Sequence, residues 1–450
     1  MSAPEKVRVG YHNLFRPEIF ERIPLTASKI LDLGCGTGTL GKELKKRQKC
    51  SVNGIEINKE ASEVAKTVLD KVWCDNLNRF DPSLVDDKYD CIVFADILEH
   101  LIDPWKALKS FASVLDDNGV IVASVPNISH PWITSQLQKG LFRYELAGLL
   151  DITHLRFFTK TTICQMFCKA GLKIVNIAPY PSELNPIQYL VQAVKPILQD
   201  KNPLLTILIL TLNCLEYTKL CINSIKQKTC MTHKIVVIDN GSNDGTIEYL
   251  RRDMEILHVE NLVNLGFGRG FNVGLELVDT PYFIICNNDV VVTYGWDSEL
   301  ADALLNEKDL VAVGPVSNYV SGPQKIEGSK YADDEGLENF AKERRKFIVE
   351  PITYFQRLVF FCTMFRSEVL AKVGFFDERF EMGNFEDDDY CVRIAEAKLK
   401  TAIINTVFVH HYGSKTFTSN AIDYRKCMED NQKKFVEKWK EALDAKVRKN

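Results

Sequence analysis

Short apolar runs that end in a polar or glycine-rich turn recur along this chain, and helical stretches follow several of them. In the first half such runs begin near residues 29, 52, 72, 89 and 119. In the second half they begin near residues 204, 234 and 283. A strand, helix, strand succession at short spacing is what a doubly wound parallel sheet requires. The pattern therefore predicts an α/β chain.

Prolines separate the two halves of this pattern. Five of them lie between residues 179 and 203, and a new apolar run begins at Leu204. A chain of 450 residues also exceeds what one hydrophobic core usually serves. The proline-rich stretch is expected to act as a stiff spacer, in which Gln188–Val194 could form a short helix. The predicted parts are a first domain at 1–180, a linker at 181–203, a second domain at 204–420 and a basic helix at 421–450.

Composition narrows the class of protein. A formal net charge of -4 gives no case for nucleic acid as a partner. The N-terminal residues lack the apolar core of a signal peptide, and no run of about 18 uncharged apolar residues occurs. Thirteen scattered cysteines, none in a CxxC pair, are typical of buried thiols in a reducing compartment. We therefore expect a cytoplasmic protein.

The segment Lys29–Gly41 is an apolar strand that runs into a glycine-rich turn. Such a turn lets backbone N–H groups and a helix N-terminus approach a ligand closely. The spacing GxGxxG, with Glu56 about twenty residues on, is also found in dinucleotide sites. However, Asp32 lies just before the first glycine, where a carboxylate would suit an ammonium group better than a pyrophosphate.

The segment Leu31–Gly38 resembles the first motif of class I S-adenosylmethionine-dependent methyltransferases, and the later segments follow in that family's order. The resemblance implies a Rossmann-like doubly wound sheet with S-adenosylmethionine as cofactor. It places Glu56 at the ribose hydroxyls and the end of the third strand near the adenine. The cofactor-binding residues that it implies are Asp32, Gly34, Gly36, Gly38, Glu56, Asp75 and Asn76.

The methyl acceptor is predicted from the segment Asp151–Thr159, which resembles part of methyltransferases encoded with surface-glycan genes. A glycan hydroxyl is therefore the expected acceptor. A neutral imidazole could remove its proton, and His100, His130 and His154 are the candidates. Each could instead be a hydrogen-bonded structural histidine. His154 is favoured as the catalytic residue because Asp151 is close in sequence and could orient its ring.

In the second half, the strand Phe283–Val292 breaks into Asn-Asn-Asp and then resumes, which places Asp289 at the rim of a sheet. The segment Lys234–Thr246 repeats this design with Asp239. Magnesium and manganese take oxygen ligands and leave other positions to substrate phosphates, so Asp289 could anchor a nucleotide diphosphate through a metal. The alternative is a polar turn between two strands.

These segments, with Asn264–Gly274 and Val373–Phe380, resemble the GT-A glycosyltransferases of family 2 over nearly the whole second half. The resemblance implies a nucleotide-diphosphate sugar donor and a divalent metal ion, Mg²⁺ or Mn²⁺. Asn287 departs from the family's DxD motif, so one carboxylate stands where the motif has two. The nucleotide-sugar-binding residues implied are Asn213, Asp239, Asn240, Gly266, Asn288 and Asp289.

The late segment Val407–Lys415 resembles a strand of the same fold whose histidine can be a further metal ligand. We favour His410 over His411 as the partner of Asp289 in metal binding, because His410 is the first residue after the apolar run.

Four consecutive acids, Glu386 to Asp389, form the strongest local signal. Mutual repulsion in a partly buried cluster would raise the pKa of at least one of them. A solvated acidic turn is the alternative. By the resemblance, Glu386 and Asp387 are the family's catalytic Glu-Asp pair, in which Asp387 takes the proton of the acceptor hydroxyl. Arg393 is expected to pair with one of these acids.

The sequence thus predicts a bifunctional enzyme of bacterial surface polysaccharide synthesis: an inverting, metal-dependent glycosyltransferase and a methyltransferase, acting on a glycan or lipid-linked acceptor. The alternative is a glycosyltransferase whose first half binds S-adenosylmethionine only to regulate or dock. The basic helix at Lys433–Lys449 carries Phe435, Val436 and Trp439, which would pack on the domain. Peripheral contact with the inner face of the cytoplasmic membrane is the alternative for this helix.

Overall fold

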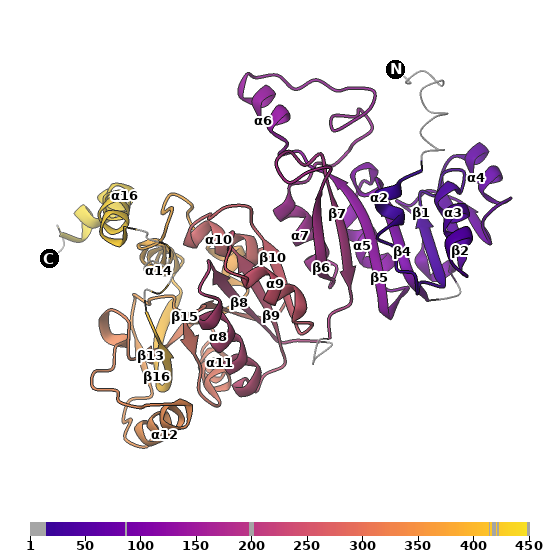
Figure 1. Ribbon diagram of the computed structural model, residues 1–450. Coiled ribbons are helices and arrows are strands. Elements are labelled where there is room, and N and C mark those ends of the chain that lie inside the picture. Colours follow the sequence, from indigo (N-terminus) through magenta and orange to yellow (C-terminus); the bar gives the residue numbers. More distant parts are fainter. Residues whose placement is uncertain are drawn as a thin grey trace. The chain divides into compact units, whose positions relative to one another are not determined.

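The structure, a computed structural model, describes residues 15–85, 88–197, 202–413, 415, 420 and 423–447 (Figure 1). The chain divides into two compact units, Met1–Ile197 and Leu198–Asn450. Each is an α/β unit built on its own sheet. The predicted fold class is therefore confirmed for both halves. None of the helices in the described ranges is long and apolar enough to cross a membrane.

The first unit is built on a seven-stranded sheet in the order β3-β2-β1-β4-β5-β7-β6. Its strands are β1 (Lys29–Leu33), β2 (Ser51–Glu56), β3 (Lys71–Cys74), β4 (Tyr89–Ala95), β5 (Leu115–Pro126), β6 (Lys173–Tyr180) and β7 (Gln188–Val194). Its helices are α2 (Pro17–Phe20), α3 (Thr39–Arg47), α4 (Lys59–Ala65), α5 (Pro104–Ala112), α6 (Pro131–Gln138) and α7 (Lys160–Lys169), with 3₁₀ turns η1 (Pro82–Leu84) and η2 (Leu98–His100).

The first five strands are parallel, as predicted. The carboxyl ends of β1, β2 and β4 therefore meet at one edge of the sheet, where open α/β sheets bind ligands. Strand β7 enters antiparallel between β5 and β6. The short helix predicted at Gln188–Val194 is thus wrong. Its residues Leu190, Val191 and Ala193 are fully buried in the sheet of the first unit, although they lie in the range predicted as a linker.

The second unit is built on a sheet in the order β10-β9-β8-β11-β15-β13-β16-β12, with β14 paired to β16. Its strands are β8 (Leu205–Thr211), β9 (His233–Asp239), β10 (Ile256–Glu260), β11 (Tyr282–Asn287), β12 (Val290–Val291), β13 (Leu310–Ser317), β14 (Ile352–Tyr354), β15 (Cys362–Arg366) and β16 (Lys400–His411). Its helices are α8 (Leu215–Lys228), α9 (Thr246–Arg252), α10 (Phe267–Leu275), α11 (Trp296–Asn306), α12 (Asp334–Arg345), α13 (Val369–Lys372), α14 (Glu386–Glu396) and α16 (Tyr424–Val447), with a 3₁₀ turn η3 (Gly322–Gln324).

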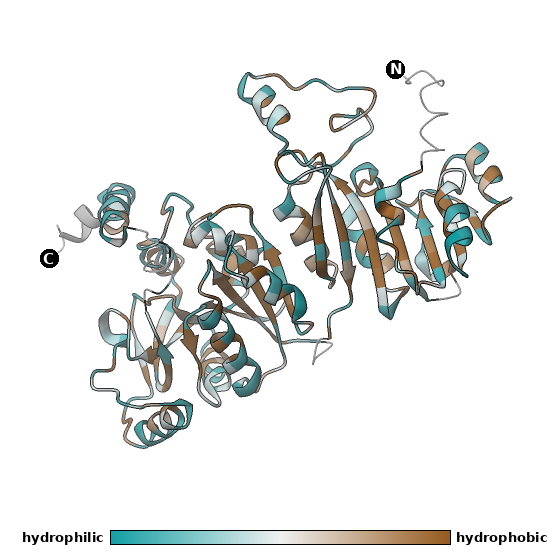
Figure 2. Cartoon of the chain, in the orientation of Figure 1, coloured by the Kyte–Doolittle hydropathy of each residue, from teal (hydrophilic) through white to brown (hydrophobic). Residues whose placement is uncertain are grey.

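Apolar residues concentrate on the central strands, while the helices present polar residues outward (Figure 2). In β8, Ile207, Leu208 and Ile209 are all fully buried, so both faces of this strand are covered. This is why its sequence is a continuous apolar run and not an alternating one. Strands β8, β9, β10 and β11 are mutually parallel, which again brings their carboxyl ends to one edge.

The C-terminal helix α16 packs on α14 and on the segment before it. Asn431 is 3% exposed and donates hydrogen bonds to the carbonyls of Gly383 (2.8 Å) and Asn384 (3.2 Å). Trp439 Nε1 donates to Asp389 Oδ1 at 2.9 Å. The predicted packing of this helix on the domain is confirmed for Trp439 and for Phe435, whose ring centroid lies 5.5 Å from that of Phe385, whereas Val436 is 47% exposed.

Candidate active sites of the two units

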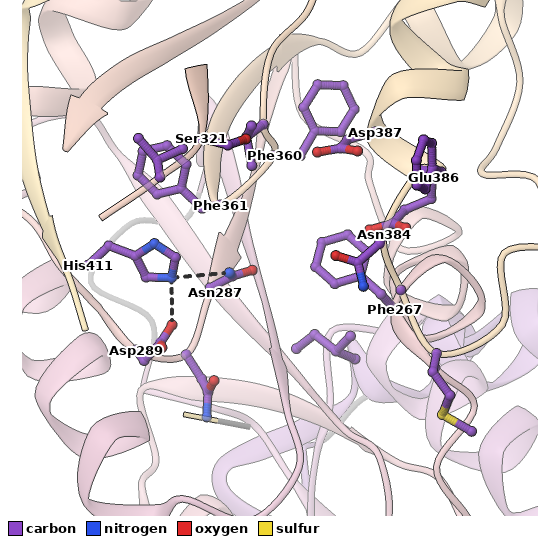
Figure 3. A pocket seen from close by; sticks show the side chains of 18 of the residues that line it. Phe267, Asn287, Asp289, Ser321, Phe360, Phe361, Asn384, Glu386, Asp387 and His411 are labelled. Atoms are coloured by element: carbon purple, nitrogen blue, oxygen red, sulfur yellow. Dashed lines mark hydrogen bonds and ion pairs between the residues drawn. The ribbon is translucent and has the colours of Figure 1, made fainter. Parts of the chain in front are cut away.

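A cavity of about 690 Å³ lies in the second unit and joins the sheet edge to the start of α14. Its walls include Asn287 and Asp289 after β11, His411 at the end of β16, and Glu386 and Asp387 (Figure 3). Figure 3 shows Asp289 and His411 on one side of the cavity, with Glu386 and Asp387 across from them. The structure thus brings together the two acids that the sequence assigned to metal and to catalysis.

His411, and not His410, faces Asp289. Its Nε2 lies 3.1 Å from Asp289 Oδ1, and its Nδ1 lies 2.7 Å from the carbonyl oxygen of Tyr319. A carbonyl only accepts, so Nδ1 carries a proton, and Nε2 is the ring nitrogen that faces the carboxylate, with Asn287 Nδ2 also 3.4 Å from it. This nitrogen and the carboxylate attract each other through a proton or a cation between them. The pair therefore fits a divalent metal ion, with the second ring nitrogen fixed as metal-binding histidines usually are.

His410 was the predicted metal ligand, and the structure places it elsewhere. Strand β12 pairs with β16 so that Val290 is opposite His411 and Val291 is opposite His410. Adjacent residues of a strand point to opposite faces, so only one of the two histidines can meet Asp289. The Nδ1 of His410 instead lies 2.6 Å from the hydroxyl of Tyr331. The geometry therefore favours His411 over His410 as the histidine that would bind a metal with Asp289.

The four consecutive acids divide into two pairs. Asp388 forms a salt bridge with Arg357 at the cavity wall. Asp389 is fully buried and is bound by Arg393 Nε at 2.9 Å and Lys438 Nζ at 2.5 Å. The expected pairing of Arg393 with one of these acids is confirmed. Glu386 and Asp387 also line the cavity, and no salt bridge between described residues reaches either of them, although the charge of Arg357 acts on Asp387.

Burial sets the protonation of this second pair. Burial, and then the charge of Asp388, raises the pKa of Asp387 to about 7. Burial, and then the charge of Asp387, raises the pKa of Glu386 well above its usual value. Among the described residues, Glu386 Oε2 has no hydrogen-bond partner. A carboxylate whose pKa lies near neutrality is suited to accept a proton from a substrate hydroxyl.

Of the residues predicted to bind the nucleotide, Gly266 lines the cavity, whereas Asp239 lies beside the lining residue Asn240. Asp239 ends β9, is fully buried, and accepts hydrogen bonds from the backbone N–H groups of Gly241 and Ser242, each at 3.0 Å. Its Oδ1 has no partner in the described part of the chain. Gly266 has a φ of +79°, and a Cβ on it would lie 1.6 Å from the carbonyl oxygen of Glu381. Glycine is required there by both backbone conformation and space.

The three predicted asparagines bind protein groups. Asn240 accepts from Asn261 Nδ2 at 2.9 Å and donates to the carbonyl of Gly266 at 3.1 Å. Asn288 Nδ2 donates to hydroxyls of β8 and α8. Asn213 Nδ2 donates to Asn420 Oδ1 at 2.5 Å. Asn240 and Asn288 line the cavity, whereas Asn213 does not, and the structure adds Asn287, Arg357 and Tyr319 to the residues that line it.

In the first unit, the predicted cofactor residues gather at the carboxyl ends of β1 and β2. Glu56 accepts hydrogen bonds from the N–H groups of Gly36 (2.9 Å) and Asn58 (2.8 Å). Burial, and then the charge of Glu56, raises the pKa of Asp32 to about 7. Gly34 has a φ of +75°, and a Cβ there would lie 2.1 Å from Ile97 Cδ1. Two buried acids beside a glycine turn fit a ligand with an ammonium group and ribose hydroxyls.

Asp75 and Asn76 follow β3 at the edge of the same sheet, where both side chains are partly exposed. Asp75 Oδ1 accepts from the backbone N–H of Asn76 at 2.7 Å and from Arg79 Nε at 3.2 Å. Their position beyond the end of β2 agrees with a contact to a distal part of the cofactor.

His154 lies against His100, with ring centroids 4.8 Å apart. Asp151 does not orient His154 as predicted, because its Oδ1 accepts from the N–H and hydroxyl of Thr153. The carbonyl of Leu149 holds the ring at Nδ1 instead, at 3.2 Å. His130, the third candidate, caps α6.

Sequence reasoning missed Glu99, which lies beside both His100 and His154. Burial raises the pKa of Glu99 to about 8. Its signal in the sequence was an acid next to a histidine, shortly after the apolar run that became β4.

Comparison with known proteins assigns each unit to a family. A model described as methyltransferase domain matches residues 11–177, and a model described as glycosyl transferase family 2 matches residues 206–374. The ubiquinone biosynthesis O-methyltransferase of Aeromonas salmonicida is 24% identical over 187 residues, which cover 38% of this chain and 78% of that enzyme. The chondroitin synthase of Pasteurella multocida is 24% identical over 262 residues, which cover 49% of this chain and 26% of that protein.

Among solved structures, a crystal structure of GalNAc-T7 with UDP, GalNAc and Mn²⁺ is similar at a TM-score of 0.38 and 16% identity. The match covers 47% of this chain and 44% of that one.

Proposed function

We propose that this chain, which contains a methyltransferase domain at residues 11–177 and a glycosyl transferase family 2 domain at residues 206–374, is a bifunctional enzyme. One unit would transfer a sugar from a nucleotide-diphosphate donor, with inversion, to a glycan or lipid-linked acceptor. The other would transfer a methyl group from S-adenosylmethionine to a glycan-related acceptor. The name of one relative, chondroitin synthase, supports a polysaccharide product, and we infer a role in bacterial surface polysaccharide synthesis.

The observation that carries the glycosyl transfer is one cavity with two separate acidic sites. Asp289 and His411 would hold Mg²⁺ or Mn²⁺ on one side, and Asp387 lies across from them. The ion would neutralise charge on the leaving diphosphate. Asp387 would take the proton of the attacking hydroxyl. A base and a leaving group on opposite sides of the sugar require inversion at the anomeric carbon.

The methyl transfer rests on the cofactor side of the first unit. S-adenosylmethionine would be held by the glycine turn, Asp32 and Glu56. Their positions at the edge of the sheet support this role. On the acceptor side we place His154, as predicted, together with His100 and Glu99. The rival function, in which this unit only regulates or docks, keeps the cofactor residues but gives this second cluster no task.

The test uses the full chain with Mn²⁺, a set of nucleotide sugars and a glycan acceptor, and determines the anomeric configuration of the product. Inversion supports the proposed roles, whereas retention would remove Asp387 as the base. A parallel incubation with S-adenosylmethionine labelled in its methyl group tests the second activity. Labelled methyl groups found in the glycan support a chain with both sugar transfer and methyl transfer. S-adenosylmethionine that binds the chain but never passes its label to the glycan supports the regulatory alternative.

A further inference from the structure

The first unit contains a buried group of polar atoms whose bonding capacity is not met. Glu99 is 1% exposed, and neither of its carboxylate oxygens has a hydrogen-bond partner among the described residues. The Nε2 atom of His100 is likewise buried without a partner there. A buried carboxyl group without hydrogen-bond partners is costly whether it is ionised or protonated, so such a group calls for a ligand. One ligand atom each from Glu99, His100 and His154 lies within 4.8 Å of the other two.

Both histidine rings are held in the tautomer that a metal requires. His100 Nδ1 lies 3.1 Å from the carbonyl oxygen of Thr153, and His154 Nδ1 lies 3.2 Å from that of Leu149. Because carbonyl oxygens only accept, each Nδ1 donates its hydrogen, and each neutral ring keeps a lone pair on Nε2. This second bond to a backbone carbonyl is typical of metal-binding histidines.

The backbone holds the group together at the edge of the sheet. Glu99 and His100 lie in η2, shortly after the carboxyl end of β4. The N–H groups of Leu155 (2.8 Å) and Arg156 (3.1 Å) both donate to the carbonyl of Glu99, which ties the segment that carries His154 to η2. Ile97, in the same turn, packs against Gly34 of the cofactor turn. The group therefore lies next to the predicted cofactor site.

We propose that Glu99, His100 and His154 bind one divalent transition-metal ion of the zinc class, with an open position for an oxygen of the methyl acceptor. Two imidazole nitrogens and one carboxylate are the donors of a catalytic zinc site, whereas magnesium prefers oxygen ligands alone. Bonds of roughly 2.0–2.1 Å hold tetrahedral ligands about 3.4 Å apart, so the three side chains draw together on binding.

Surrounding charges also favour a cation. Asp151 acts electrostatically on Glu99 and on both histidines, and its carboxylate is held by Thr153. The positive charge that acts on Glu99 is that of Arg16, which is committed to salt bridges with Asp96 and Glu18. A proton shared between Glu99 and a ring nitrogen would be a simpler way to satisfy these atoms than a metal ion. However, no hydrogen bond joins them in the described structure.

The use of the ion rests on the proposed methyl transfer, whereas its binding does not. A bound zinc-class ion lowers the pKa of an oxygen that it holds, which would prepare an acceptor hydroxyl for methylation. Metal bound without any methyl transfer would count against the proposed function alone. Methyl transfer by a chain that binds no metal here would count against this site alone.

The experiment measures zinc on the full chain, purified without a histidine tag and dialysed against ZnCl₂. The Asp289→Ala background removes the metal ligand proposed in the second unit. In that background we expect one bound zinc per chain. We expect Glu99→Gln or His154→Ala to lower the zinc affinity by a factor on the order of 100 or more, since even outer-shell changes cost 10–100-fold. Co²⁺ in place of Zn²⁺ should give the visible absorption of a cobalt ion with low coordination number. We expect this absorption in the Asp289→Ala chain and not in the chains that also carry the Glu99 or His154 change.

His130→Asn is the matched control, because His130 belongs to the same unit and asparagine can still cap α6. It should keep the zinc. Calorimetry of S-adenosylmethionine binding serves as the test that each variant is folded. If Glu99→Gln or His154→Ala fails this test, His154→Gln is measured in its place. An Asp289→Ala chain that takes up no zinc would overturn the proposal. Glu99 and His154 variants that bind zinc as tightly as the Asp289→Ala chain would also overturn the proposal.

Discussion

Asp387 and Asp289 line one cavity but should fail differently when they are replaced. Proton removal by Asp387 matters mainly in the transition state, so Asp387→Asn should leave donor affinity nearly unchanged. Turnover should fall by a factor on the order of 100 to 10,000. Donor titration and initial rates measure the two effects separately. Glu396→Gln, an exposed change at the end of the same helix, is the control. Wild-type turnover in Asp387→Asn would exclude the residue as the base.

The raised pKa of Asp387 also predicts how the rate depends on pH. A base works in its ionised form, and the pKa of this carboxyl is raised to about 7. Below that pH an increasing share of the enzyme is protonated, so kcat/KM for sugar transfer should fall about tenfold per pH unit on the acid side. A profile of kcat/KM between pH 5 and 9 measures this. A flat profile down to pH 5 would contradict the assignment.

The two neighbouring histidines can be separated by metal titration. His411 Nε2 faces Asp289, whereas His410 is bound to Tyr331. We therefore expect Asp289→Ala and His411→Ala to raise the Mn²⁺ concentration needed for half-maximal sugar transfer. His410→Ala should leave that concentration near the wild-type value. The reverse result would restore the role that the sequence gave to His410.

Sequence motifs brought Asp289 and Asp387 forward as candidates, because each stands at a fixed place in a family pattern, and the structure places both on the wall of one cavity. The motifs were not sufficient for the histidine. Neighbouring positions of a strand differ only in the face they occupy, and that face depends on the register of β12 with β16. Glu99 was missed for a related reason. Its partner His154 lies 55 residues later, and contacts formed only in the folded chain bring the two segments together, among them the hydrogen bonds of Leu155 and Arg156 to the Glu99 carbonyl.

Among the elements, α16 contacts α14, the helix that carries the proposed base Asp387, and the segment before it. Asn431 binds the carbonyls of Gly383 and Asn384, and the three residues before α14 all have positive φ. Asn431→Ala would leave the buried carbonyl of Gly383 and the partly buried carbonyl of Asn384 without this donor, at a cost of about 1 to 3 kcal/mol. We expect a lower Tm and a lower rate of sugar transfer, because the loop positions Asp387.

Thermal unfolding and initial rates test this expectation. Gln432→Ala, at the exposed neighbouring position of the same helix, is the control and should change neither. If Asn431→Ala kept both the Tm and the rate, α16 would not contribute to the catalytic support.

The strand β7 shows where reading elements from sequence fails. Its sequence, Gln-Tyr-Leu-Val-Gln-Ala-Val, is short and mostly apolar, and prolines lie before and after it. Periodicity cannot separate a buried strand from a helix over so few residues. The deciding fact is tertiary, because β7 pairs with β5 on one side and β6 on the other.

At the scale of the full chain, two units with separate sheets should work as separate proteins. A fragment of residues 1–197 contains all seven strands and should fold and bind S-adenosylmethionine. Glu56→Ala in this fragment should weaken binding by about 1.5 to 3 kcal/mol, the worth of a charge-assisted hydrogen bond. Calorimetry measures both, and NAD is the control ligand. Binding of NAD in place of S-adenosylmethionine would contradict the assigned cofactor.

The residue at which this fragment ends should decide whether it folds stably. A fragment that stops at residue 180, where the sequence placed the end of the first domain and the start of the linker, lacks β7. Strand β6 would then lose the partner that joins it to the sheet, and β5 would become an exposed edge. Exposed edges promote aggregation, and the apolar residues of the sheet that pack around Leu190 would lose their cover. We expect residues 1–180 to aggregate or to melt well below residues 1–197 in a thermal scan. Equal stability of the two fragments would show that β7 is dispensable for the first unit.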